Sequence, residues 1–169
     1  MSRNFPSFQS LVVNIGETTC EMVLSSPAGV VMSRTLPVGA KSFDACIAEH
    51  MKRTHQLVIG ERAAEEIRIR IGSTGPLEPE LTLPVTGRNL ATGLPTTVTI
   101  DSAEFRAAIH EPLAMILESL KIILERCPPE LARALEDHGI LLTGIGTQLR
   151  GFDQWLSEKT KLPVHYADD

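Results

Sequence analysis

The stretch Asn14-Ile15-Gly16-Glu17-Thr18-Thr19-Cys20-Glu21 decides how this chain folds. An apolar run enters it and a second one leaves it, which predicts two strands joined by a tight turn. A turn of this layout holds a phosphate with successive backbone N–H groups, and glycines let the anion come close. Here Gly16 is the one glycine in the stretch, and Glu17 brings a carboxylate toward the anion. The turn therefore predicts a nucleotide-binding fold with a degraded phosphate site.

The composition is that of a soluble globular domain, with 169 residues, 43% hydrophobic and 22% charged. A net charge of −5 argues against a nucleic-acid partner, which would require a basic stripe. The apolar runs are too short for a membrane span, and the first residues do not resemble a signal peptide. We therefore expect a cytoplasmic protein without direct membrane insertion.

The cysteines and histidines show no spacing typical of a metal site or a disulfide framework. The three cysteines lie far apart, which favours reduced thiols in or near the core. His50 and His55 are five positions apart, which fits one helical face poorly, so the sequence predicts no pairing and no metal.

The first half of the chain predicts an antiparallel meander followed by a helix with Ser42 as its N-cap and Phe43, Ile47 and Met51 on its buried face. The segment up to residue 100 is broken by prolines and glycines, which indicates a small inserted unit. The expected elements are strands at 11–15, 20–25 and 30–36, a helix at 43–54, a helix at 61–71 ending at Gly72, and short strands at 81–83 and 97–100.

The second half predicts a long helical region and a closing strand–turn–helix unit. Asp101 and Glu104 form a capping box before an apolar stripe that Pro112 should kink or split. The expected elements after the stripe are a short helix from 130, a buried strand at 140–143, a glycine turn at 144–147, a helix at 148–159 and an edge strand at 162–166.

Three peptides resemble the MreB family of bacterial actins. Residues 125–132 follow the family's EQCPPELA, residues 87–95 follow GRNLAEGVP, and residues 142–150 follow LTGGGALLR. The resemblance covers residues 11–169 and corresponds to the second half of the family's fold. It implies an α/β fold, half of an actin-like (ribonuclease H-like) ATPase, in which a mixed sheet is flanked by helices and carries a small inserted α+β subdomain. The implied large subdomain comprises 11–54 and 101–169, the small subdomain 55–100, and an N-terminal extension 1–10.

The resemblance also implies a vestigial nucleotide site. The family's hairpin reads DIGGGTTE; here Asn14 replaces the acid that helps to hold the magnesium water shell, and Glu17 and Thr18 replace two glycines. Glu65 and Arg68 match a Glu and Lys three apart, either as ribose ligands or as an exposed helix pair. The residues carried over to the site are Gly16, Thr18, Thr19, Gly39, Glu65, Arg68, Gly144 and Gly146.

The family's first half supplies the other phosphate loop and the water-orienting acid, and this chain has no counterpart of it. We therefore expect a truncated MreB-like protein that is not an active ATPase by itself, with no catalytic residue and no cofactor of its own, acting as a binding component of the cell-shape cytoskeleton. The implied partners are full-length MreB or a RodZ-like adaptor. Two alternatives stay open. One is half of a split ATPase, in which a separate first half docks on residues 16–21, 65–68 and 144–146 and completes a site for ATP with magnesium. The other is a decayed fragment without function.

Overall fold

The hairpin predicted from the turn at residues 14–21 opens the fold. A computed structural model describes residues 10–167 of the chain. Strand β1 (Leu11–Ile15) pairs antiparallel with β2 (Cys20–Ser26), and β2 pairs antiparallel with β3 (Gly29–Leu36). Alternate residues of β1 are buried because successive side chains of a strand point to opposite faces. The predicted meander is confirmed.

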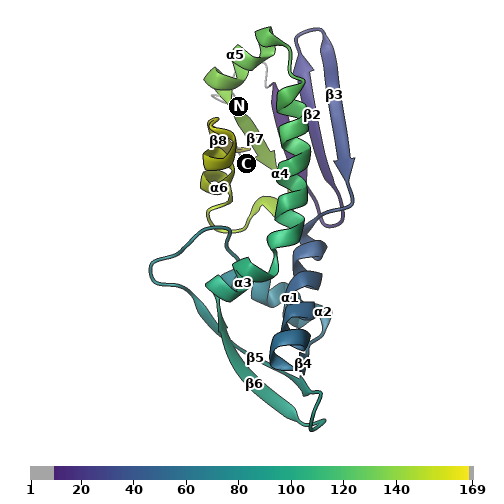
Figure 1. Cartoon of the computed structure of the whole chain (residues 1–169), viewed down its shortest axis with the longest axis vertical. Helices are drawn as coiled ribbons and strands as arrows, with labels where there is room; N and C mark the ends of the chain where they lie inside the picture. Colours follow the sequence, from purple (N-terminus) through teal and green to yellow (C-terminus); the bar gives the residue numbers. More distant parts are fainter. Residues whose placement is uncertain (1–9, 168–169) are drawn as a thin grey trace, which may run out of the picture.

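Two parallel strands extend the meander into a mixed sheet. Strand β7 (Ile140–Thr143) pairs with β1, and β8 (Val164–Tyr166) pairs with β7 at the edge. The order across the sheet is β3-β2-β1-β7-β8 (Figure 1). The sheet is therefore mixed, and its last strand is the edge strand that the sequence predicts.

Helices cover this sheet. Helix α4 (His110–Glu125) runs across it and contacts β2 and β3, while α5 (Pro129–His138) lies near one end and α6 (Phe152–Thr160) contacts β8 (Figure 1). The long helical region is split as predicted, because α3 (Ser102–Ala108) ends before Ile109 and α4 begins at His110. Pro112 then lies in the first turn of α4, where a missing N–H costs no hydrogen bond. Asp101 accepts a hydrogen bond from the N–H of Glu104 at 2.9 Å, which confirms the cap.

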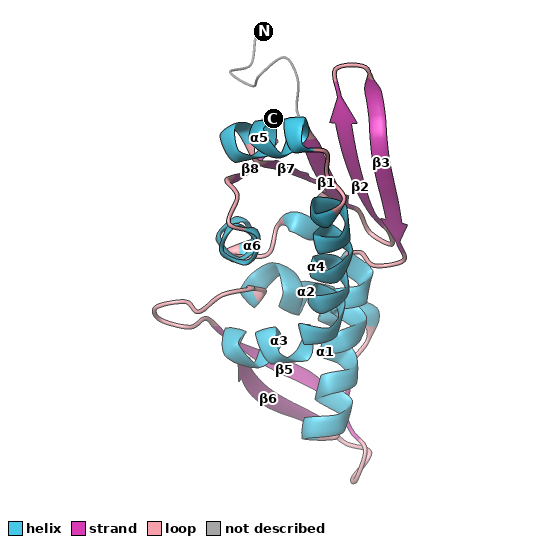
Figure 2. Ribbon diagram, turned by 45° about the horizontal axis from the view of Figure 1, so that its top comes forward, coloured by secondary structure: helices cyan, strands magenta, loops and turns pink. Residues whose placement is uncertain are grey.

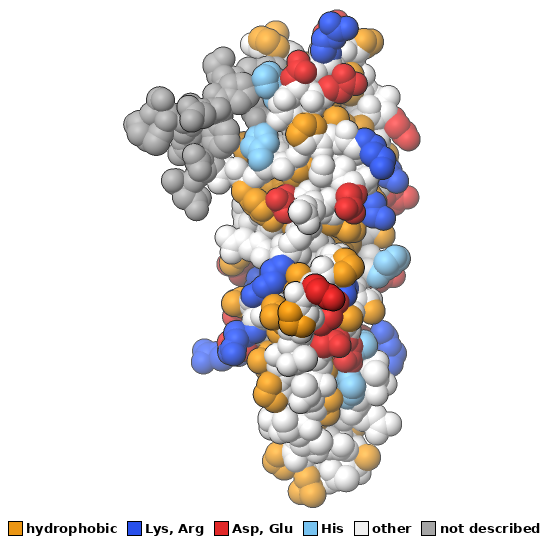
Figure 3. Space-filling model, turned by 90° about the vertical axis from the view of Figure 1, so that its left-hand side faces the viewer, with side chains coloured by type: hydrophobic (Ala, Val, Ile, Leu, Met, Phe, Trp, Pro, Cys, Tyr) orange, Lys and Arg blue, Asp and Glu red, His pale blue; other side chains and the backbone are white. Residues whose placement is uncertain are grey.

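A second, antiparallel sheet has the order β4-β5-β6. Its strands are β4 (Leu57–Val58), β5 (Thr82–Asn89) and β6 (Pro95–Asp101), so β5 and β6 are longer than predicted. The strand β5 continues through Pro84 because this residue pairs with β6 alone: β4, on the other side, pairs only with residues 88 and 89. On an unpaired side of a strand, the N–H that proline lacks is not needed. The assignment of this region to a separate subdomain, 55–100, stays a prediction. Figure 3 shows apolar side chains at the narrow lower end of the molecule, where the turn between β5 and β6 exposes Leu90 and Leu94.

Helices α1 (Ala40–His55) and α2 (Glu61–Ile71) lie with α3 between the two sheets (Figure 2). The prediction that Ser42 caps α1 is wrong. The helix begins at Ala40 with Gly39 as its cap, and the Ser42 hydroxyl accepts a hydrogen bond from the Gly39 N–H at 3.0 Å. The buried face of Phe43, Ile47 and Met51 is confirmed, as is the end of α2 at Gly72.

The last predicted helix begins four residues later than expected. After β7 the chain forms a 3-10 turn, η1 (Ile145–Thr147), and α6 starts only at Phe152. The backbone of Arg150 is not helical because it bonds to the segment after α2. Its N–H donates to the Gly72 carbonyl, and its own carbonyl accepts from the Thr74 N–H. Gly151 then takes a left-handed conformation that caps α6.

The predicted extension at residues 1–10 lies outside the described residues except for Ser10, whose side chain is buried. Within residues 10–167, the helices are too short or too polar to cross a bilayer.

Candidate functional site

The turn at residues 16–19 is seated on the start of α1. The N–H of Ala40 donates to the Gly16 carbonyl and the N–H of Lys41 to the Glu17 carbonyl, both at 2.9 Å. The first N–H groups of a helix have no partner within the helix and are the groups that would hold an anion. Two of those groups on α1 are therefore occupied by the turn itself.

Gly39 lets the turn approach the helix this closely. A Cβ at this position would lie 2.5 Å from the carbonyl carbon and oxygen of Glu17 and 2.6 Å from the N of Thr18. Real side chains do not tolerate such distances to backbone atoms. Gly39, carried over as a ligand-binding residue, is thus required for packing whether or not a ligand binds.

The glycine loop after β7 lies against the end of β1 in the same way. Gly144 has a φ of 95°, and a Cβ there would collide with the Ile15 carbonyl and with Asn14 Oδ1. A Cβ on Gly146 would collide with the Ile15 side chain. Asn14 Oδ1 accepts a hydrogen bond from Thr143 Oγ1 at 2.8 Å, so the residue at the family's acidic position ties β1 to β7.

A pocket of about 480 Å³ opens beside these loops, between α1 and α2. Its size falls in the range that small-molecule sites occupy. Of the predicted site residues, Glu65 and Arg68 line it, whereas the turn and the glycine loop reach it through Glu17 and Ile145. The lining residues are Glu17, Ala40, Lys41, Asp44, Ala45, Ala48, Ile59, Gly60, Glu61, Arg62, Ala64, Glu65, Arg68 and Ile145. The six other predicted residues, Gly16, Thr18, Thr19, Gly39, Gly144 and Gly146, lie in the neighbouring loops and do not line the pocket.

Arg68 is buried in the pocket wall, so the interpretation of Glu65 and Arg68 as an exposed pair is wrong for Arg68. Its side chain is 7% exposed, and its Nε donates to Asp44 Oδ1 at 2.6 Å. Glu65 Oε2 lies farther away, 3.7 Å from Nη2. Burial raises the pKa of Asp44, although the hydrogen bond from Arg68 acts in the opposite direction. Asp44 is not among the predicted site residues, because its pairing with Arg68 spans 24 residues and such a separation carries no helical or strand periodicity.

The charges around the pocket do not favour a polyphosphate. Four carboxylates and three basic side chains line it, and the guanidinium of Arg68 is engaged by Asp44. Glu17 and Lys41 face each other at 4.0 Å, and both side chains are more than 60% exposed, so solvent screens their attraction. The lining residues therefore offer little positive charge to balance the phosphates of a nucleotide.

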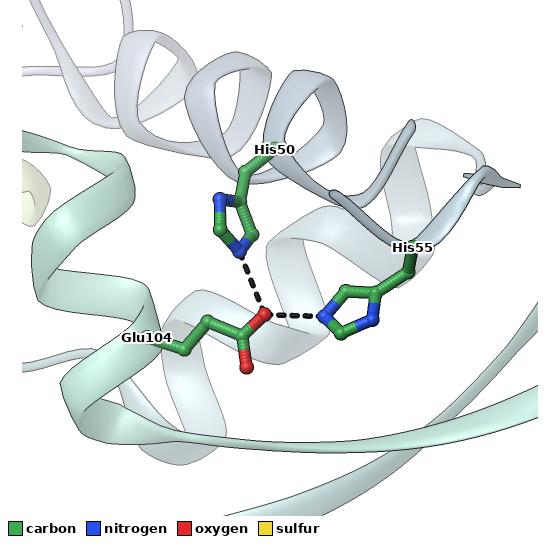
Figure 4. Close-up of side chains that lie close together, drawn as sticks. All are labelled: His50, His55 and Glu104. Carbon is green, nitrogen blue, oxygen red and sulfur yellow. Dashed lines mark hydrogen bonds and ion pairs between the residues drawn. The ribbon is translucent and has the colours of Figure 1, made fainter. Parts of the chain in front are cut away.

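The structure also overturns the prediction that the histidines do not pair. His50 and His55 of α1 both form hydrogen bonds from Nε2 to Oε2 of Glu104 on α3 (Figure 4). Burial opposes the ionisation of Glu104, but the two histidine hydrogen bonds outweigh it and lower the pKa of this carboxyl. Sequence spacing missed the cluster because its third member comes from another helix.

Comparison with known proteins agrees with the fold and the peptides. The model of the MreB/Mbl protein family matches residues 5–169. The cell shape-determining protein MreB of Escherichia coli K12 is 41% identical over 160 residues, which are 95% of this chain and 46% of that protein. Mbl of Bacillus subtilis is 37% identical over 160 residues, again 95% of this chain and 48% of that protein. The chain thus spans about half the length of the curated relatives it matches.

Solved structures agree as well. MreB5 of Spiroplasma citri, crystallised with AMPPNP, is 29% identical with a TM-score of 0.89, over 93% of this chain and 47% of that one. The subunit of the MamK double helical filament, at 19% identity and a TM-score of 0.76 over 95% of this chain and 50% of that one, shares the fold. The fold is therefore that of the actin-like proteins, and the chain belongs to the MreB/Mbl family.

Proposed function

We propose that this chain is a binding component of the cell-shape cytoskeleton that does not itself hydrolyse ATP. Membership in a family named for cell-shape determination supports the cytoskeletal setting. The observation that supports the non-hydrolysing role is the lining of the pocket between α1 and α2. Glu17 occupies the turn where phosphate would lie, and Asp44 engages the guanidinium of Arg68.

Nucleotide binding provides the first test. We expect the purified chain to bind Mg-ATP no more tightly than adenosine, because the phosphates meet a net acidic pocket. Calorimetry with both ligands measures this difference directly. Replacing Glu17 by Gln removes one charge from the turn; at about 4 Å in water that charge is worth about 1 kcal/mol, so ATP affinity should rise about fivefold.

Adenosine affinity of the Glu17→Gln variant should stay unchanged, since adenosine carries no charge. Glu61→Gln, which neutralises another lining carboxylate on the first residue of α2, is the matched control. Micromolar binding of Mg-ATP to the unaltered chain, or its hydrolysis by that chain alone, would overturn the proposal.

Partner binding provides the second test. The partners that the family resemblance suggests are MreB filaments and a RodZ-like adaptor in the cytoplasm. We expect the chain to sediment with MreB filaments, or to bind the adaptor, without forming ordered protofilaments by itself. A head-to-tail filament grows only if each subunit carries both contact surfaces, and this chain matches about half of its relatives' length. Protofilaments of the isolated chain in electron micrographs would contradict this expectation, and binding to neither partner would favour the decayed fragment.

The size of the pocket favours one further candidate, a split ATPase. A pocket of about 480 Å³ between α1 and α2 can still receive a nucleoside. In that case ATP with magnesium would bind only after a second chain or segment supplied phosphate ligands. Adding a first half of an MreB-type protein in trans should then create tight ATP binding that neither part shows alone.

A further inference from the structure

The cluster of His50, His55 and Glu104 lies outside the pocket and has no part in the function proposed above. The Nε2 atom of His50 lies 2.7 Å from Oε2 of Glu104, and Nε2 of His55 bonds to the same oxygen. One possible ligand atom from each residue lies within 4.8 Å of the other two. Figure 4 shows both imidazoles directed at the carboxylate from α1.

These positions fit a first-row metal ion. Zinc binds imidazole nitrogen and carboxylate oxygen at about 2.0–2.2 Å, so tetrahedral ligand atoms stand about 3.3 Å apart. Both imidazole nitrogens now lie at hydrogen-bond distance from the Glu104 oxygen, closer than that separation, and all three atoms lie within 4.8 Å of one another. Side-chain rotations that move the two rings away from the oxygen would admit the ion. The donor set, two imidazoles and one carboxylate, suits zinc better than calcium or magnesium, which prefer oxygen alone.

Neighbouring residues fix the three side chains of the cluster in position. The three side chains are 14%, 24% and 23% exposed, so they are fixed by packing while solvent still reaches them for a fourth ligand. Thr54 Oγ1 lies 3.4 Å from Nδ1 of His50, the position from which a second residue orients a ligating imidazole. The cap formed by Asp101 fixes the turn of α3 that carries Glu104.

The place of the cluster in the fold gives a bound ion a structural consequence. His55 ends α1, and the chain enters the second sheet two residues later at Leu57. The chain leaves that sheet at Asp101 and enters α3, on which Glu104 lies. The two crossings between the sheets are therefore adjacent at this point.

We propose that His50, His55 and Glu104 bind a zinc ion that fastens α1 to α3 where the chain crosses between the two sheets. The ion would replace hydrogen bonds that the carboxylate now makes to both rings. It would thereby hold the second sheet at a fixed angle to the first.

The experiment uses the full chain without a histidine tag, stripped with chelator and titrated with Zn²⁺ in competition with a chromophoric chelator. We expect one ion per chain, a micromolar or tighter Kd and a higher melting temperature with zinc. His50→Gln and His55→Gln should each weaken binding by at least about tenfold, since loss even of a residue that orients a ligand costs 10–100-fold. His110→Gln alters an exposed histidine outside the cluster and should bind zinc as the unaltered chain does.

Cobalt substitution separates this site from the three free cysteines. Co²⁺ held by nitrogen and oxygen gives weak visible bands, whereas thiolate ligands add intense near-ultraviolet absorption. Circular dichroism of the metal-free variants checks that they fold. If a histidine variant does not fold, the zinc affinity of Glu104→Gln and the cobalt spectrum of the unaltered chain test whether the cluster binds the ion. Absence of micromolar binding, unchanged affinity in the folded variants, or a thiolate spectrum would each overturn the proposal.

Discussion

Replacing Gly39 by Ala tests whether the turn at residues 16–19 is held by packing on α1. The φ and ψ of Gly39, −151° and −165°, are open to alanine, so the effect is steric alone. A Cβ 2.5 Å from the Glu17 carbonyl must gain about 1 Å to reach ordinary contact. If the turn stays, the overpacking costs about 1–3 kcal/mol. If the turn moves, it weakens two hydrogen bonds to α1, each worth about 0.5–1.5 kcal/mol, which gives the same range.

Gly75→Ala is the matched control, because a Cβ at Gly75 would meet open space. Both variants reduce the freedom of the unfolded chain equally, so the difference between them isolates the clash. Urea unfolding followed by the fluorescence of Trp155, the single tryptophan, measures both free energies of unfolding. We expect Gly39→Ala to be less stable than Gly75→Ala by about 1–3 kcal/mol. A difference below about 0.5 kcal/mol would refute the packing role of Gly39.

Three further predictions concern stability. Leu120→Ala should cost about 2–5 kcal/mol because Leu120 is fully buried in α4, whereas Met115→Ala on the exposed side of the same helix should stay within about 0.5 kcal/mol in the same urea assay. Arg68→Met leaves the mostly buried Asp44 without its cation and should cost about 3–5 kcal/mol, against at most about 1 kcal/mol for Arg70→Met, whose partner Glu66 is exposed. Hydrogen bonds from Arg106 and Ser102 lower the pKa of Glu80 from 4.5 to about 2, so stability from this carboxylate is present above pH 4.5 and is lost as the pH falls toward 2. Glu80→Gln should flatten that part of the pH–stability profile, and an unchanged slope would contradict the pairing.

The sequence predicts those elements of the fold that local patterns determine. The alternation around the turn predicts β1 and β2, and the four-residue spacing from Phe43 predicts the buried face of α1. The predicted start of α6 is wrong because the backbone of Arg150 bonds to Gly72 and Thr74, more than 70 positions away. Such contacts leave no trace in the periodicity of a single helix.

The candidate site follows the same division. Glu65 lies three residues before Arg68 on the chain, and the family resemblance at this spacing carried both over to the site, where both line the pocket. Asp44, by contrast, meets Arg68 from another helix, and Glu104 meets His50 from 54 positions away. Pairs between elements depend on how the helices pack, which is decided by the whole core and not by either local sequence.

The glycines of the loops separate what the fold requires from what a ligand would require. Where a Cβ would collide with backbone or core, at Gly39, Gly144 and Gly146, glycine is present. Glu17, Thr18 and Ile145 stand at positions where the family's hairpin and last loop carry glycine. The side chains of Glu17 and Thr18 are exposed and Ile145 is 42% exposed, so packing does not require glycine at these positions. The packing of the fold therefore requires glycine at positions 39, 144 and 146, but it does not require glycine at positions 17, 18 and 145. We therefore expect nucleotide affinity to change more when the exposed Glu17 is substituted than when a retained glycine is, provided that the glycine variant folds.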